Sequence, residues 1–497
     1  MPVFSVLNLA IFITTTLCAL FLPFLHSEFI LDDGHKIVEN YDIRDCSLLP
    51  WSLFPQYEQG ERDLSLQFKM NRNDPSRPLT FLMYTLEYRI AGGAHPWIFR
   101  IVNVFLHGIN GILLYSLLNM CCKRLPVLNR SSSDFHFLHA AATLLWIFCP
   151  LNISTVNYAY GRSEILGFTF ELCCFKMLLR GQNCEPLAGF FALLAMLAKQ
   201  SYICMVPCVF ILFILFPSLR SHLVNGVEPH SHPQTSLSAT VFEALHRSMP
   251  CTFAAVLCTV YRLVYLGGLG DLEADPSNLP VPFFHYLRTQ PFAFFSYLLI
   301  TFSGGMAVDH GVLVDDPVPI LFPCFVIGSL FVVSCVIFRK SRPACKIFLF
   351  GWVFALAHLA PTSLVVTTDV MADRRFYVGS FPFILFVCVL VGYFCVKSNE
   401  RGSSNDSNNL SAHLAMSGAF GLAFSLYLAI AYRHLDAYQS NISAWRNVLG
   451  FYPNSVRAHN NLATSLIQKC RSCPPGDQFA LQSVGFLSCI PFVFDLQ

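Results

Sequence analysis

Charged side chains are scarce in this chain. Asp, Glu, Lys and Arg make up only 12% of its 497 residues, whereas hydrophobic residues make up 54%. Soluble domains carry roughly 25% charged residues, so the composition argues against a soluble globule and predicts a polytopic membrane protein. The net charge of +2 and the lack of a basic tract also argue against a nucleic-acid partner.

The chain also lacks the paired cysteine motifs of a structural zinc site. Cys470 and Cys473 form one C-x-x-C pair, but no second pair accompanies it. Most of the 20 cysteines are scattered, many of them inside apolar runs. We therefore expect them to pack as small hydrophobic residues within helices.

Apolar runs recur along the chain and predict an all-α fold with about eleven transmembrane helices. Residues 187–217 can instead form one broken helix. The additional stretch 292–308, within the segment 268–318, is expected to be re-entrant or interfacial on the lumenal side. The runs lie at approximately 3–25, 98–118, 137–150, 163–180, 187–198, 202–217, 249–267, 319–338, 346–366, 378–396 and 412–432.

Basic residues cluster in three connecting segments, 123–130, 339–346 and 397–401. The positive-inside rule places these segments in the cytosol. The first apolar segment has no basic start and no small-residue cleavage motif, so we expect an uncleaved signal anchor. The first loop, 26–97, and the chain after residue 432 then lie on the lumenal side.

The first lumenal loop begins with an acidic pair, Asp32 and Asp33, a few residues after the first apolar segment. Two adjacent carboxylates at a membrane surface can act as a general base or hold a cation. The alternative is a solvated turn, because Asp-Asp-Gly is favourable loop chemistry after a helix.

Three further ionisable residues stand near the lumenal ends of predicted spans, where charge is costly and often functional. Glu164 can cap a helix N-terminus or serve a site. Arg162 can pair with Glu164 or meet an anion. Lys199 can belong to a turn between two helices or bind an anionic head group.

The segment from Asp373 to Tyr377 carries two arginines, Arg374 and Arg375, at the lumenal mouth of a predicted span. Arginine binds phosphate through a planar, bidentate fork. Interfacial anchoring by Arg and Tyr is the alternative. Because basic residues are normally depleted on this side of a membrane, a ligand is the preferred interpretation.

Two residues of the first loop and the next span complete the predicted site. Arg77 precedes a proline and an amphipathic stretch, 79–90, that is expected to lie flat on the membrane face. His107 shares a helix face with Asn103. Such residues more often make interhelical hydrogen bonds than bind ligands.

Several of these motifs, in their order and spacing, resemble the transmembrane and tetratricopeptide-repeat-containing family of endoplasmic-reticulum protein O-mannosyltransferases, within the glycosyltransferase C superfamily. The resemblance covers roughly residues 3–465. The motifs that carry it are Leu31-Asp32-Asp33-Gly34-His35, Ile37-Val38-Glu39-Asn40, the segment 88–107, Gly161-Arg162-Ser163-Glu164, Ala198-Lys199-Gln200 and Asp373-Arg374-Arg375-Phe376-Tyr377.

The resemblance implies transfer of mannose from dolichyl phosphate mannose to Ser or Thr hydroxyls of secretory-pathway proteins such as cadherins, in the endoplasmic-reticulum membrane. Asp32 or Asp33 would be the catalytic base. Arg374, with Arg375, Lys199 and Arg162, would bind the donor phosphate. Glu164, Asp373, Tyr377, Arg77 and His107 would support the site. The pair of carboxylates could also hold one divalent cation.

The family's long repeat array is reduced here. Residues 1–432 form the expected multi-span domain, 433–468 cover about one repeat, and 469–497 show no helical repeat period. About three repeats are usually needed for stability, so the repeat region is truncated. A multi-span transporter and a catalytically inactive membrane scaffold are the alternative functions.

The predicted topology can be tested by N-glycosylation. The sequons at Asn152 and Asn441 are expected to be lumenal, and the sequon at Asn405 cytosolic. We expect an endoglycosidase-sensitive mass shift that disappears in Asn441→Gln. Loss of a glycan in Asn405→Gln would instead overturn the topology.

Overall fold

The computed structural model describes ten stretches of the chain, and their regular structure is helical. A single antiparallel bridge, between His310 and Met371, is the exception within these stretches. The all-α prediction is therefore confirmed for the described part of the chain. The stretches are 6–44, 73–124, 132–220, 236–266, 282–305, 307–310, 318–338, 342–367, 369–400 and 406–472.

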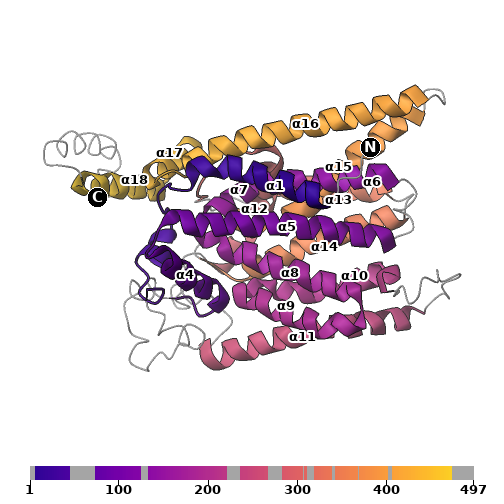
Figure 1. Cartoon of the computed structure of the whole chain (residues 1–497), viewed down its shortest axis with the longest axis horizontal. Helices are drawn as coiled ribbons and strands as arrows, with labels where there is room; N and C mark the ends of the chain where they lie inside the picture. Colours follow the sequence, from indigo (N-terminus) through magenta and orange to yellow (C-terminus); the bar gives the residue numbers. More distant parts are fainter. Residues whose placement is uncertain are drawn as a thin grey trace.

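Most of the helices run side by side along the long axis of the molecule, and three lie at one end of it: α4, α17 and α18 (Figure 1). The helices are α1 (Val6–Phe21), α4 (Pro78–Ala91), α5 (Pro96–Arg124), α6 (Ser132–Ile147), α7 (Pro150–Asn157), α8 (Arg162–Arg180), α9 (Glu185–Ala198), α10 (Met205–Leu215), α11 (Leu237–Tyr261), α12 (Phe283–Ser303), α13 (Val318–Phe338), α14 (Arg342–Leu364), α15 (Ser380–Glu400), α16 (Asp406–Ala437), α17 (Asn441–Phe451) and α18 (Val456–Ser472).

Four described helical segments are long and apolar enough to cross a membrane: Val6–Phe24, Pro96–Arg124, Cys345–Leu364 and Leu414–Ala437. A fifth results if α6 and α7, which meet at a 48° bend, count as one broken span. Helices α9, α10, α13 and α15 contain shorter apolar segments. The structure thus supports four to five spans, and the predicted count of about eleven exceeds this number.

The run 187–217 forms two helices that reverse direction at Lys199. Lys199 ends α9 in an extended conformation, with φ −156° and ψ 120°. Arg247 bonds Glu185 at the start of α9 and also lies over the ring of Phe213 near the end of α10. The two outer ends are therefore close together, which excludes a single broken helix.

The connection between the predicted runs 137–150 and 163–180 is largely helical. Pro150, with its fixed φ, starts α7, and every residue of that short helix is buried. Asn152 is fully buried and its amide donates to the Trp146 carbonyl at 2.6 Å. A glycan cannot be accommodated there, so the prediction of glycosylation at Asn152 is corrected.

Helix α12 covers most of the stretch predicted to be re-entrant or interfacial. Tyr286, near its start, donates to the carbonyl of Thr362, and Tyr297 donates to the carbonyl of Ala372 at 3.0 Å. The start of α12 thus contacts the last turn of α14, and its second half contacts the connection that follows α14. Residues 267–281 and 311–317 of the predicted lumenal segment lie outside the described residues.

The C-terminal helix pair, defined as α17 and α18, packs on the first loop. Ser440 caps α17 through a reciprocal capping box with Ser443. Trp445 and Leu462 share a hydrophobic cluster with Ile30 and other residues of the first loop. This contact buries part of the apolar face of the single repeat, which would otherwise be exposed. Residues 473–497, most of the predicted irregular tail, lie outside the described residues.

The turn between α7 and α8 depends on a glycine. A Cβ on Gly161 would lie 2.2 Å from the backbone oxygen of Thr155, and a backbone atom cannot rotate away. We expect Gly161→Ala to destabilise the fold by about 1–3 kcal/mol, seen as a lower thermal unfolding midpoint in detergent. Gly418→Ala on α16, where a Cβ meets nothing within 4 Å, is the control and should be neutral or slightly stabilising. Equal midpoints would contradict the steric argument.

Candidate functional site

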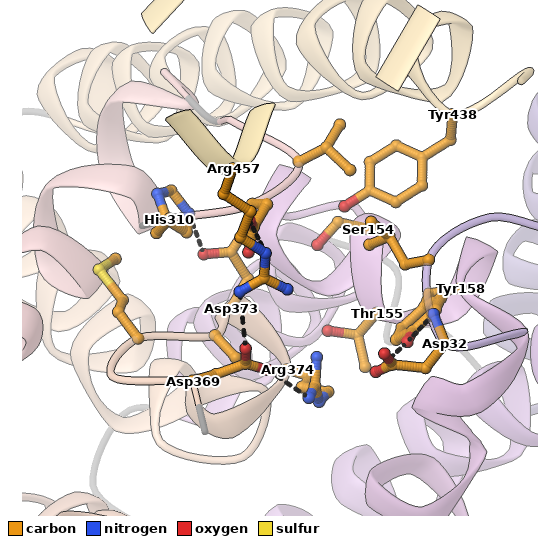
Figure 2. Close-up of a pocket in the computed structure, with 15 residues that line it drawn as sticks. Asp32, Ser154, Thr155, Tyr158, His310, Asp369, Asp373, Arg374, Tyr438 and Arg457 are labelled. Atoms are coloured by element: carbon orange, nitrogen blue, oxygen red, sulfur yellow. Dashed lines mark hydrogen bonds and ion pairs between the residues drawn. The ribbon is translucent and has the colours of Figure 1, made fainter. Parts of the chain in front are cut away.

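A polar pocket opens at the end of the bundle that carries the C-terminal helix pair. Figure 2 shows Asp32 and Tyr158 on one side of it and Asp369, Asp373, Arg374 and Arg457 on the other. Six segments of the chain therefore meet there. The lining residues are Leu31, Asp32, Ser154, Thr155, Tyr158, Val308, Asp309, His310, Asp369, Met371, Ala372, Asp373, Arg374, Tyr438 and Arg457.

Asp32 is the member of the acidic pair that reaches the pocket. The Tyr158 hydroxyl donates to its Oδ2 at 2.7 Å, and the Asp32 backbone N–H donates back to that hydroxyl at 3.2 Å. Leu31, just before it, has φ +52°, a left-handed conformation that is costly for a branched side chain. Asn441 accepts from the Leu31 N–H at 3.3 Å and helps to hold this conformation.

Asp33 points away from the pocket into the protein. Its side chain is fully buried and accepts from the backbone N–H groups of Tyr160 at 2.9 Å and Ile30 at 3.4 Å. Burial raises the pKa of Asp33 to about 7, against the opposing effect of the Arg100 guanidinium. Asp33 therefore anchors the loop. Of the two aspartates predicted as the catalytic base, Asp32 is the one that lines the pocket.

Arg374 supplies a cation on the opposite side of the pocket. Its guanidinium bonds Asp369 Oδ2 at 3.1 Å and lies over the Tyr158 ring, 5.7 Å from the centroid. Although burial acts to lower it, Tyr158, Asp369 and Asp32 raise the pKa of Arg374, so the group stays charged. Arg375 turns away from the pocket and donates to Thr367 Oγ1 at 2.8 Å. Of the two arginines predicted to bind phosphate, Arg374 therefore lines the pocket and Arg375 does not.

Asp373 lines the pocket and pairs with a histidine that sequence reasoning did not single out. His310 Nε2 lies 2.9 Å from Asp373 Oδ1, and its Nδ1 lies 3.2 Å from the Tyr452 hydroxyl. Burial acts to lower the pKa of His310, but the Asp373 carboxylate outweighs it and raises that pKa. The His310–Asp373 pair therefore joins residues 307–310 to the segment that carries Arg374 and Arg375.

Arg162 is a structural residue, which corrects its predicted phosphate role. Its side chain is 0% exposed and forms an ion pair with Glu87 of α4. It also donates to the Phe99 carbonyl at 2.8 Å and to the side chain of Asn103. A phosphate could reach it only by breaking a buried ion pair, which costs several kcal/mol.

Lys199 and Glu164 form a second ion pair beside the pocket and do not line it. Tyr202 donates to the backbone oxygen of Glu164 at 2.7 Å, which fixes the turn after α9 to the start of α8. Burial lowers the pKa of Lys199 to about 8, although the Glu164 carboxylate opposes this. The pairing favours a role in joining helices over direct binding of a head group.

The other predicted supporting residues also lie outside the pocket lining. Arg77 bonds Asp74 at 3.1 Å and stacks on the Tyr160 ring at 5.3 Å. The Tyr377 hydroxyl lies 2.7 Å from His107 Nδ1 inside the bundle. His107 therefore makes interhelical contacts, as its ordinary packing role predicts.

Sequence reasoning missed Tyr158, Asp369, His310 and Arg457. Tyr158 stands between two predicted spans and next to the Gly161 motif, which was the one available signal. His310 and Arg457 needed the tertiary structure, because their partners Asp373 and Asp369 are distant in sequence. Asp369 pairs locally with Arg374, but its second partner, Arg457, is distant. Among the described residues, no three His, Cys, Asp or Glu side chains are placed so as to hold a metal ion.

Comparisons with known proteins give one consistent result. Protein O-mannosyl-transferase TMTC4 of Mus musculus is 28% identical over 152 residues, which is 30% of this chain and 20% of that protein. Protein O-mannosyl-transferase TMTC1 of Mus musculus is 28% identical over 230 residues, 42% of this chain and 22% of that protein. This chain is a distant homologue of TMTC1 and TMTC4. The resemblance seen in the motifs is confirmed at that level.

The human TMTC4 and TMTC1 proteins match similarly, at 28% and 27% identity. In each case the matched region spans only about a fifth of the relative's length. No family model and no solved structure matches the chain.

The buried Asp33 carboxyl predicts a pH effect on stability. Its folded pKa of about 7 lies above the unfolded value of 3.8, so the folded state binds the proton more tightly. The stability that Asp33 contributes is then greatest below about pH 4 and is lost as the pH rises toward 7. Between pH 5 and 7.5, we expect the thermal unfolding midpoint of wild type to fall more steeply than that of Asp33→Asn. Parallel curves would show that Asp33 does not titrate in this range.

Proposed function

We propose that this protein is a mannosyltransferase that transfers mannose from dolichyl phosphate mannose to Ser or Thr hydroxyls of proteins. The observation that carries the proposal is that Asp32 and Arg374, distant in sequence, line one pocket. A carboxylate and a guanidinium across one cavity suit a reaction that removes a proton and releases a phosphate. The distant homology to TMTC1 and TMTC4 supports the same reaction class.

Asp32 is the proposed general base. A serine or threonine hydroxyl is a weak nucleophile until a positioned carboxylate accepts its proton. Tyr158 occupies Oδ2 of Asp32, which leaves Oδ1 for the acceptor hydroxyl. The oxygen then forms a bond to the anomeric carbon while the bond to the donor phosphate breaks. This single displacement inverts the configuration of the sugar.

Arg374 is the proposed cation for the leaving phosphate. Negative charge grows on dolichyl phosphate as the glycosidic bond breaks, and a nearby guanidinium stabilises it. Arg374 pairs with Asp369 in the structure. The phosphate would therefore replace a carboxylate as the partner of Arg374, an exchange of one anion for another. Arg375 and Lys199 support the site through the segments that they hold.

The cellular setting belongs to the same proposal. We place the protein in the endoplasmic-reticulum membrane with about eleven spans, with the pocket and the C-terminal helix pair on the lumenal side. Acceptors would be secretory or cell-surface proteins, for which cadherins are the first to test. The pocket includes Arg457 of the C-terminal helix pair, and this pair lies at one end of the bundle (Figure 1). A transporter instead places its substrate site near the bilayer midplane.

The test is mannose transfer from labelled dolichyl phosphate mannose to an acceptor peptide by the full chain in detergent or liposomes. We expect Asp32→Asn to lower kcat by about 10²–10⁴-fold, the range for loss of a general base, with little change in donor affinity. Arg374→Gln should raise KM for the donor and lower kcat.

Asp436→Asn is the control, because this aspartate lies at the end of α16 and outside the pocket lining. It should transfer at the wild-type rate. If wild type transfers no mannose to any acceptor, or if Asp32→Asn transfers as well as wild type, the proposed enzyme function is wrong.

A further inference from the structure

The C-terminal helix pair contacts three of the segments that build the pocket. Asn441 donates to the Phe29 carbonyl at 3.1 Å, beside the acidic pair. Asn447 accepts from the Val308 N–H at 3.0 Å, and Tyr452 bonds His310. Arg457 reaches the segment that carries Arg374. This helix pair is therefore part of the pocket wall.

Arg457 is the only charged residue that the pair contributes to the described pocket lining. Its Nε lies 3.3 Å from Asp309 Oδ2 and its Nη1 lies 3.3 Å from Asp369 Oδ1. Asp369 uses its other oxygen for Arg374. One carboxylate thus links the arginine of the repeat helix to the arginine of the proposed donor site.

The charges of the pocket explain how the contact between Arg457 and Asp369 affects binding of a phosphate. Four carboxylates line it, and Arg374 and Arg457 are the two permanent cations among the described lining residues. The phosphodiester of the donor, which carries one negative charge, must enter against this negative excess. Arg457 neutralises part of the Asp369 charge, so Asp369 holds Arg374 less strongly and the phosphate can replace it.

We propose that Arg457 is a positioning residue for the anionic group of the lipid-linked donor, acting on Arg374 through Asp369. The single repeat-type helix pair therefore serves donor binding, in addition to any acceptor contact. This inference rests on the proposed function for its donor, but donor binding can be measured without transfer.

The experiment is equilibrium binding of dolichyl phosphate mannose to the detergent-solubilised full chain, together with KM and kcat for the donor. One ion pair of a half-exposed arginine changes an equilibrium by at most about fivefold. We therefore expect Arg457→Gln to weaken donor binding about three- to fivefold, with kcat changed less than twofold. Arg457→Lys, which keeps the charge, should recover most of the affinity.

Arg471→Gln is the matched control, because it removes the same charge from an exposed position on the same helix. It should bind donor as wild type does. A thermal unfolding midpoint for Arg457→Gln close to that of wild type separates the effect from misfolding. Weakened binding by both variants, or by neither, would overturn the proposal.

Double variants test the route through Asp369. Coupled residues give non-additive effects, whereas independent ones add. In an Asp369→Asn background, Arg457→Gln should weaken binding by less than about twofold. In an Asp309→Asn background, its effect should stay at about three- to fivefold. An undiminished effect in the Asp369→Asn background would show that Arg457 does not act through that carboxylate.

The two proposals fail in different ways. If wild type transfers mannose but Arg457→Gln binds the donor normally, only the positioning role is wrong. If wild type binds the donor and Arg457→Gln weakens it, yet no acceptor is mannosylated, the transferase function is wrong and the binding role stands. If wild type neither binds nor transfers, both fail.

Discussion

The site depends on one buried carboxylate. Asp33 accepts backbone hydrogen bonds from Tyr160 and Ile30, and so ties the first loop to the turn before α8. A buried acceptor without these donors would cost several kcal/mol. Because Asp33 is held inward, its neighbour Asp32 must point outward, next to Tyr158. The acidic pair is therefore one buried anchor, Asp33, and one carboxylate that lines the pocket, Asp32.

Arg100 completes this anchor from α5. Its guanidinium donates to the carbonyls of Leu25, Ser27 and Glu28, and to that of Asn157. One side chain thus satisfies four backbone oxygens. Three of them lie in the segment that follows α1, and one lies at the end of α7. The first loop leaves α1 in a defined direction, which allows the C-terminal helix pair to pack on it.

The buried ion pairs could be predicted only in part from the sequence. The sequence indicated that Arg162, Glu164 and Lys199 are costly charges that need a partner. It did not indicate that Arg162 pairs with Glu87, because α4 and α8 are far apart in sequence. Paired charges of this kind join helices, so Arg162, Glu164 and Lys199 hold the scaffold and do not line the pocket.

The amino-acid sequence alone determined the helical, membrane-type fold, because apolar runs allow few other solutions in lipid. It also indicated Asp32 and Arg374 as candidate site residues, through motifs next to predicted spans. Only the tertiary structure decided that they share one pocket, that α7 replaces a loop, and that Arg457 joins the site. The reason is physical: hydropathy is a local property of the chain, whereas the partner of a charge is set by which helices pack together.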